Sequence, residues 1–148
     1  MATLNIITQP NEILRKRSKE VTDFSSRLHE LLDDMAETMR AREGLGIAAV
    51  QVGILWRACI VDSADGLVEL DNPVIIPQSK PKKGDEGCLS VPGARGGVSR
   101  SQEITVRAQD RHGKPFERKF TGMEAVCVGH EIDHFDGILF TDRVGGEK

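Results

Sequence analysis

The sequence predicts an α+β fold, in which mostly antiparallel β-strands pack around a central helix and a further helix lies near the N-terminus. Three observations favour this fold: an amphipathic helical pattern early in the chain, several short β-type runs in the middle, and a second helical pattern before the C-terminus. Strands that follow one another without an intervening helix are typical of α+β proteins rather than of α/β proteins.

Size and composition indicate one domain. The chain has 148 residues, of which 39% are hydrophobic and 29% are charged. These are ordinary values for a globular protein that builds its own core. The sequence shows no internal repeat, low-complexity tract or linker, so we expect a single domain over residues 1–148.

The first helix is predicted from Ser25 or Ser26, either of which can serve as N-cap, to about Arg42, where Gly44 and Gly46 stop it. Apolar side chains recur there at intervals of three and four residues, namely Leu28, Leu31, Leu32, Met35 and Met39. This spacing places them on one face of a helix.

Four β-type runs follow, at residues 57–62, 67–76, 99–110 and 115–121. Residues 103–108 alternate polar and apolar side chains, as a half-buried strand does, and the segment 110–114 (DRHGK) is typical of a hairpin turn. A mostly antiparallel sheet is expected.

The second helix is predicted from Gly122 or Met123 to about Asp136, with Gly137 as its C-terminal stop. Its apolar residues do not form one clean stripe: Met123, Val126, Cys127, Ile132 and Phe135. Most of its circumference should therefore be covered by protein, which makes it the central helix.

Charge and cysteine content limit the partners. The net charge of −3 argues against DNA binding, which usually needs a cationic surface. Basic runs at 15–19 and 80–83 are interpreted as solvated faces beside turns, and transient contact with an RNA-rich partner such as the ribosome is the weaker alternative. Three cysteines, no signal peptide and no bilayer-length apolar run predict a cytoplasmic protein without membrane association.

The sharpest motif is HEIDH at residues 130–134, within the second predicted helix. His130 and His134 are one helical turn apart, so both can bind one metal ion, and Glu131 can reach a water on that ion. A catalytic site of this kind needs a third protein ligand. Cys88, in EGCLS at residues 86–90, is the best candidate, whereas Cys59 and Cys127 lie in apolar runs typical of buried cysteines.

A glycine-rich segment, GLGIAAVQ at residues 44–51, matches neither a P-loop nor a dinucleotide fingerprint. Its small residues would let backbone lie close to a substrate, and the amide N–H of Gln51 could complete an oxyanion hole. A tight helix-to-strand turn explains the same segment equally well when it is considered alone.

Together, GLGIAAVQ, EGCLS and HEIDH resemble the three signature motifs of the peptide deformylase family, in the family's order and approximate spacing, and the similarity runs from Ile6 to about Asp142. The resemblance implies a hydrolase that removes the formyl group from N-formylmethionine of nascent polypeptides. It implies one divalent metal ion, natively Fe²⁺ and replaceable by Zn²⁺, Ni²⁺ or Co²⁺, held by Cys88, His130 and His134.

The resemblance also implies residue roles. In the implied mechanism, Glu131 takes a proton from a water on the metal ion, the resulting hydroxide attacks the formyl carbon, and Glu131 then protonates the departing amine. Gln51 and the backbone N–H of Leu89 stabilise the oxyanion, and formate is released. The methionine pocket or the peptide-backbone site would include Leu45, Gly46, Glu86, Arg95, Met123, Val126 and Cys127.

Two departures from the family pattern are Gly129, where glutamine is common, and Val50, where proline or threonine is often found. Asp133 is expected to support the ligands, with Arg100 as its partner, and a solvent-facing aspartate on the helix is an almost equal alternative. Two alternatives remain. A His-Glu-x-x-His metallopeptidase would take its third ligand from Asp136, Asp142 or Glu147, and a catalytically silent deformylase-like binding module would keep only the fold.

Overall fold

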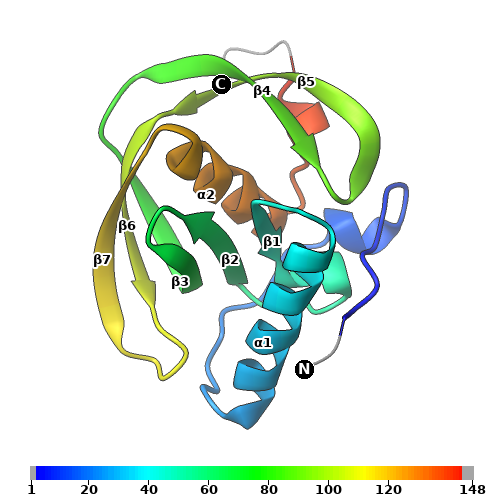
Figure 1. The fold of residues 1–148 in the computed structure, drawn as a ribbon, viewed down its shortest axis with the longest axis vertical. Coiled ribbons are helices and arrows are strands. Elements are labelled where there is room, and N and C mark those ends of the chain that lie inside the picture. The colour runs from blue at the N-terminus through cyan, green and yellow to red at the C-terminus, as the bar shows by residue number, and fades with distance from the viewer. Residues whose placement is uncertain (1–2, 145–148) are drawn as a thin grey trace.

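The computed structural model describes residues 3–144 and confirms the α+β fold (Figure 1). Helix α2 (Gly122–Phe135) lies in the middle of the molecule, and α1 (Ser26–Ala41) lies at the edge farthest from the β4–β5 strands. Three short 3-10 turns complete the helical content of this part of the chain: Glu12–Arg15, Ala49–Val52 and Phe140–Asp142. No helix within residues 3–144 is both long and apolar enough to cross a membrane.

Five strands form one antiparallel sheet in the order β1-β2-β3-β6-β7. Their bounds are Gly46–Ala48 (β1), Ala58–Ser63 (β2), Gly66–Pro77 (β3), Glu103–Gln109 (β6) and Pro115–Thr121 (β7). The predicted hairpin turn joins β6 to β7. There the Asp110 carboxylate accepts the backbone N–H groups of His112 and Lys114, and Gly113 adopts a φ of 82°.

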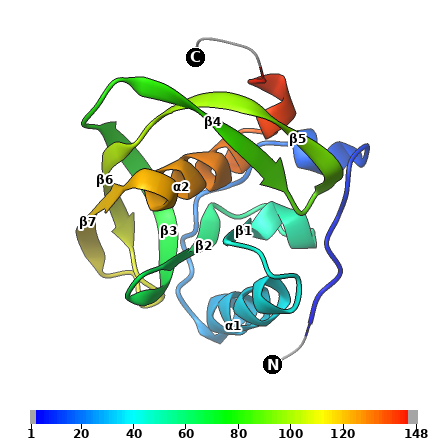
Figure 2. The same cartoon turned by 45° about the horizontal axis from the view of Figure 1, so that its top comes forward.

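One helix packs on each face of this sheet. Successive side chains of a strand point to opposite faces, so alternate residues contact different helices. Val61 and Cys59 on β2 belong to the core cluster that contains Val128 and Phe135 of α2. Ile60 and Ala58, the intervening residues, pack in the cluster that contains α1 side chains. The β4–β5 strands cover the other side of α2 (Figure 2). Because protein lies on both sides of this helix, the apolar residues of 122–135 need not form a single stripe.

A second, two-stranded sheet arches over α2 (Figures 1 and 2). It pairs β4 (Pro81–Cys88) with β5 (Val91–Ser101), and the sequence analysis missed most of it. Both strands contain few apolar residues, with the sequences PKKGDEGC and VPGARGGVSRS, so there is no apolar alternation to detect. The run predicted as one strand at 99–110 is the end of β5 followed by β6. The basic run 80–83 is exposed as expected, but its last residues lie on a strand.

The helix limits agree with the prediction to within a few residues, with one difference in mechanism. Neither Gly44 nor Gly46 ends α1. The chain turns at Glu43, which has a φ of 55°. Ser25 occupies the N-cap position, but its oxygen accepts no capping bond, and its hydroxyl donates to Asp23.

Candidate metal centre

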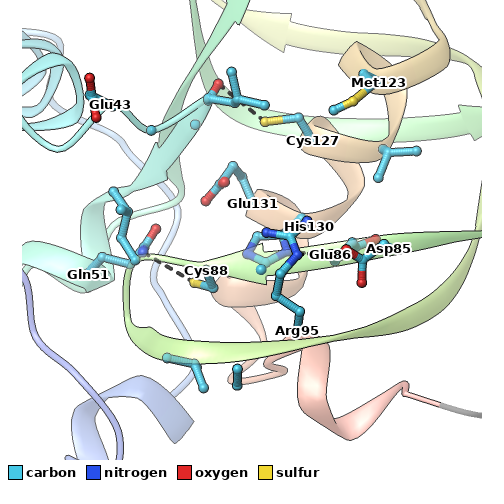
Figure 3. A pocket seen from close by; sticks show the side chains of 18 of the residues that line it. Glu43, Gln51, Asp85, Glu86, Cys88, Arg95, Met123, Cys127, His130 and Glu131 are labelled. Carbon is cyan, nitrogen blue, oxygen red and sulfur yellow. Dashed lines mark hydrogen bonds and ion pairs between the residues drawn. The ribbon is translucent and has the colours of Figure 1, made fainter.

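A cavity of about 510 Å³ opens between α2, the end of β4, and the segment 43–51. Figure 3 shows its walls, with Cys88, His130 and Glu131 in the interior. Every residue that the sequence analysis assigned to the site lines this cavity except His134, which is completely buried behind it. The fold therefore brings together segments 44–51, 86–90 and 123–131.

Three side chains converge as metal ligands would. One donor atom each of Cys88, His130 and His134 lies within 4.8 Å of the others, and within residues 3–144 they form the only such group of three or more. Cys88 Sγ is 3.4 Å from His134 Nε2. Two imidazoles and a thiolate are a common donor set for zinc and other first-row transition metals, so these residues fit a divalent ion.

The pKa values of His130 and His134 also fit a site for a metal cation. Burial lowers the pKa of His134 to about 3, which keeps its ring neutral and its lone pair available. Burial also opposes a charge on His130, but hydrogen bonds to Cys88 and Glu86 outweigh it and raise the pKa of His130 to about 10. The same anionic groups would stabilise a metal ion in place of that proton.

His130 is fixed by Glu86. The ring Nδ1 lies 2.9 Å from Glu86 Oε1, and because a carboxylate accepts, Nδ1 carries the proton and Nε2 is left for a metal. Burial raises the pKa of Glu86, but the hydrogen bonds from His130 and Arg100 more than compensate, so the net shift is downward. Glu86 lines the cavity, yet its carboxylate is fully engaged with these two partners.

Glu131 is buried beside the ligands. Burial raises the pKa of its carboxyl group to about 7, and its Oε1 has no hydrogen-bond partner among the described residues. Gly46 explains how β1 approaches so closely, because a Cβ there would lie 2.7 Å from Glu131 Oε2. A carboxyl group that titrates near neutrality can both accept and release a proton.

Gln51 has a fixed orientation. Its Oε1 accepts the backbone N–H of Ala48 at 2.9 Å, so the amide nitrogen must point the other way. Nε2 donates to Ser90 Oγ at 3.1 Å. It also donates to Cys88 Sγ at 3.6 Å (Figure 3). The glycine-rich segment thus supplies an N–H donor beside the candidate metal ligands, in addition to forming a turn.

The expected pairing of Asp133 with Arg100 is confirmed by an Nη1–Oδ2 distance of 2.8 Å. The sequence analysis missed a second partner of Asp133. Arg143 donates from Nε and Nη2 to both carboxylate oxygens, at 2.7 and 3.1 Å. No pattern in the sequence marks Arg143. Gly129, where relatives commonly have glutamine, lies next to Arg100 and lines a second cavity of about 370 Å³. The glycine therefore leaves space beside the ion pairs of Asp133 with Arg100 and Arg143.

The mouth of the large cavity combines apolar and charged side chains. Met123 and Leu45 are 69% and 53% exposed at its rim, and Arg95 pairs with Asp85 at 2.6 Å. Cys127 lines the same cavity, and its thiol donates to the carbonyl oxygen of Leu45. Cys59 is buried in the core below, as expected for a small apolar side chain, and burial raises its pKa and that of Cys127.

The residues named for a metallopeptidase site do not converge on the histidines. Asp136 pairs with Arg57 at 2.5 Å, and Asp142 pairs with Arg15. Glu147 lies outside the described residues. The ligand set therefore favours the cysteine of β4 over a third ligand after the helix.

Comparisons with known proteins agree with this geometry. The polypeptide deformylase family matches residues 3–148. The chain is 50% identical over 144 residues to a peptide deformylase from Caldicellulosiruptor bescii, covering 97% of this chain and 87% of the relative. It is 44% identical to peptide deformylase 1 from Bacillus subtilis, covering 97% and 91%.

Solved structures give the same result. A peptide deformylase from Thermotoga maritima superimposes with a TM-score of 0.93 at 36% identity, covering 97% of this chain and 98% of that one. One from Legionella pneumophila gives a TM-score of 0.92 at 41% identity, covering 97% and 86%.

Proposed function

The chain belongs to the polypeptide deformylase family, and from that premise we propose that Cys88, His130 and His134 bind its catalytic metal ion. Members of this family are metal-dependent hydrolases, and this chain is an enzyme that removes the formyl group from N-formylmethionine of nascent polypeptides, releasing formate. The observation that carries the assignment of the ligands is the convergence of these three side chains beside Glu131 in one cavity.

A bound divalent ion would supply Lewis-acid chemistry and would make a nearby water molecule more acidic. Glu131 is the proton carrier of the reaction. It accepts the proton of the attacking water and delivers it to the methionine nitrogen as the C–N bond breaks. Its burial and its raised pKa support this role.

The negative charge that develops on the formyl oxygen is stabilised by two N–H donors, the Gln51 side-chain amide and the Leu89 backbone. The fixed orientation of Gln51 supports its role, since the bond from Ala48 holds Nε2 toward Cys88. Leu89 follows Cys88 directly and lines the same cavity.

The methionine side chain occupies the apolar part of the cavity, against Leu45, Met123, Val126 and Cys127. The absence of a Cβ at Gly46 gives the formylated end access to Glu131. Arg95, at the mouth, holds the peptide that follows the methionine. Glu86 lines this cavity and acts mainly through His130.

We further propose that Fe²⁺ is the native metal and that Zn²⁺, Ni²⁺ or Co²⁺ can replace it, because thiolate and imidazole donors suit all four ions. Anaerobic purification followed by metal analysis tests this assignment. An iron form should lose activity in air or peroxide faster than a nickel form does, through the metal and then the Cys88 thiolate. Equal rates of loss in the two forms would argue against iron-centred damage.

The substrate suggests the cellular setting. We propose that residues 1–148 are one catalytic domain that works in the cytoplasm, where nascent chains emerge, with at most weak ribosome contact and no DNA or membrane partner. The net charge of −3 disfavours contact with the phosphates of RNA, so any contact with the ribosome should be weak.

The test of the function is hydrolysis of formyl-Met-Ala by the metal-loaded enzyme, followed as formate release. Cys88→Ala should lose both the metal and the activity. A variant that keeps stoichiometric metal without Cys88 would overturn the ligand assignment, and a fully loaded wild type without formate release would overturn the catalytic one.

A further inference from the structure

A chain of ion pairs begins at the ligand His130. Glu86 accepts from His130 Nδ1, and Arg100 holds the same carboxylate with two bonds, Nε–Oε2 at 2.5 Å and Nη2–Oε1 at 3.1 Å. These side chains are almost completely buried, with 8% of Arg100 and 5% of Glu86 exposed. Bidentate pairs of this kind fix the orientation of a carboxylate as well as its charge.

Arg100 pairs with a second carboxylate in addition to Glu86. Its Nη1 donates to Asp133 on α2, one turn of helix beyond His130. Asp133 could therefore draw Arg100 away from Glu86. Arg143 counters this by binding both oxygens of Asp133, so the charges alternate from Arg143 to Glu86 and each carboxylate has its own guanidinium fork.

Arg143 follows the 3-10 turn Phe140–Asp142, which contacts His130 by a second route. The Phe140 ring stacks on the His130 imidazole with centroids 6.1 Å apart and an interplanar angle of 26°. Phe140 is itself buried with Leu139 and Leu14. One C-terminal turn thus packs on the His130 ring and supplies the last member of the ion-pair chain.

We propose that Arg143 is a positioning residue that, through this chain, fixes the ring of His130 and slows loss of the metal ion. The inference rests on the proposed metal centre. Partners that orient a ligating histidine typically change metal affinity about 10- to 100-fold when removed. Arg143 is more remote than Glu86, so removing it should accelerate metal release about three- to tenfold.

The experiment uses the Co²⁺-loaded enzyme and follows the thiolate-to-cobalt absorption band after excess EDTA is added. Arg143→Met should release cobalt faster than the wild type, while kcat and KM of the metal-saturated variant stay within about threefold. Arg143→Lys, which keeps the charge without the fork, should lie between the two.

The matched control is Arg15→Met. Arg15 holds the same turn from outside by pairing with Asp142 and with the carbonyl oxygen of Gly137, but it has no bond to Asp133. This variant should lower the melting temperature and leave the release rate unchanged. Equal acceleration in the Arg15 and Arg143 variants would overturn the proposal, because loosening of the turn would then explain both.

A double variant tests the route. If Arg143 acts through Asp133, adding Arg143→Met to Asp133→Asn should not accelerate release further. Additive effects would overturn the ion-pair route. Failure of the proposed function would look different, because the wild type would then bind no cobalt or would release no formate. The positioning role fails if the wild type is active and Arg143→Met releases cobalt at the wild-type rate.

Discussion

At the scale of single residues, burial determines what Glu131 can do. Its carboxylate lies in the cavity wall next to His130, is 4% exposed, and has a pKa raised to about 7 by burial. It is not one of the three convergent ligands. Its contribution should therefore be proton transfer rather than metal binding.

The first prediction follows from this separation of roles. Glu131→Gln should keep near-stoichiometric metal and lose turnover by about 10²-fold or more, because an amide cannot carry the proton. Metal analysis beside formate release checks both statements. Near-normal turnover in the variant would contradict the mechanism, and loss of the metal would contradict the separation of roles.

Asp71 is a second buried carboxyl group, and it lies outside the site. It is completely buried on β3, and neither of its oxygens has a hydrogen-bond partner among the described residues. Burial and the nearby Glu69 raise its pKa to about 7, although Arg111 opposes them. Because an unfolded chain ionises such a group near pH 4, the folded state binds more protons between about pH 4 and 7. The free energy of unfolding therefore falls as pH rises through this range.

The second prediction is that Asp71→Asn raises the free energy of unfolding at pH 8 by on the order of 1–3 kcal/mol, and by less at pH 5. Urea denaturation at both pH values checks it. Asp65→Asn is the matched control, since Asp65 is 85% exposed and should show little change at either pH. A gain that is the same at pH 5 and pH 8 would exclude ionisation of Asp71 as the cause.

At the scale of elements, the close approach of β1 to α2 shapes the site. A Cβ at Gly46 would lie 2.6 Å from Cys127 Sγ and 2.7 Å from Glu131 Oε2, both closer than real contacts allow. Both atoms end flexible side chains, so the helix and the strand can stay in place while these side chains move.

The third prediction is therefore that Gly46→Ala lowers kcat about tenfold or more with metal content and fold retained, because it displaces the Glu131 carboxylate. Circular dichroism and metal analysis accompany the kinetics. Gly84→Ala on β4 is the control, since a Cβ there meets nothing within 4 Å. Equal kinetics for the two variants would show that the approach of β1 is not critical.

At the scale of the whole molecule, the candidate ligands join two layers. Cys88 ends β4 in the two-stranded sheet, whereas His130 and His134 belong to α2. A metal ion bound by all three would connect the β4–β5 arch to the central helix. The ion would stabilise the folded chain by mass action, since its site exists only when both layers are in place.

The fourth prediction is that metal removal by a chelator lowers the melting temperature by about 5 °C or more, and that the loss of protection is largest in residues 81–101. Thermal unfolding and amide hydrogen exchange of the two forms check this, with re-addition of metal as the control. Unchanged exchange in that segment would show that the arch holds its place without the ion.

The fifth prediction concerns the ribosome. Dispersed lysines and arginines are the groups available to contact RNA in a chain with a net charge of −3. Co-sedimentation with ribosomes should therefore be weak and should disappear as salt is raised above physiological strength. Binding that persists at high salt would reveal a docking surface that does not depend on charge.

Much of the fold and the site could be predicted from local patterns. Spacing of apolar residues located α1 within a few residues, the segment between Gly122 and Gly137 was correctly predicted as α2, and strand alternation with a hairpin turn located β6 and β7. The motif HEIDH placed two ligands on one helix face, since that depends only on helix geometry. Cys88 and Gln51 were selected through the family resemblance and through local composition.

The rest depends on contacts between distant segments. The β4–β5 sheet was missed because its strands contain few apolar residues and show no apolar period. The chain turns after α1 at Glu43, which no glycine rule selects. Arg143 binds Asp133, and Phe140 stacks on His130, only after the C-terminal turn packs against α2. The sequence by itself thus determined the helices, the central strands and the candidate metal ligands, because these follow from local patterns and short motifs. Tertiary structure alone decided the raised pKa of Glu131 and the support of His130, since burial and ion pairing depend on which segments meet.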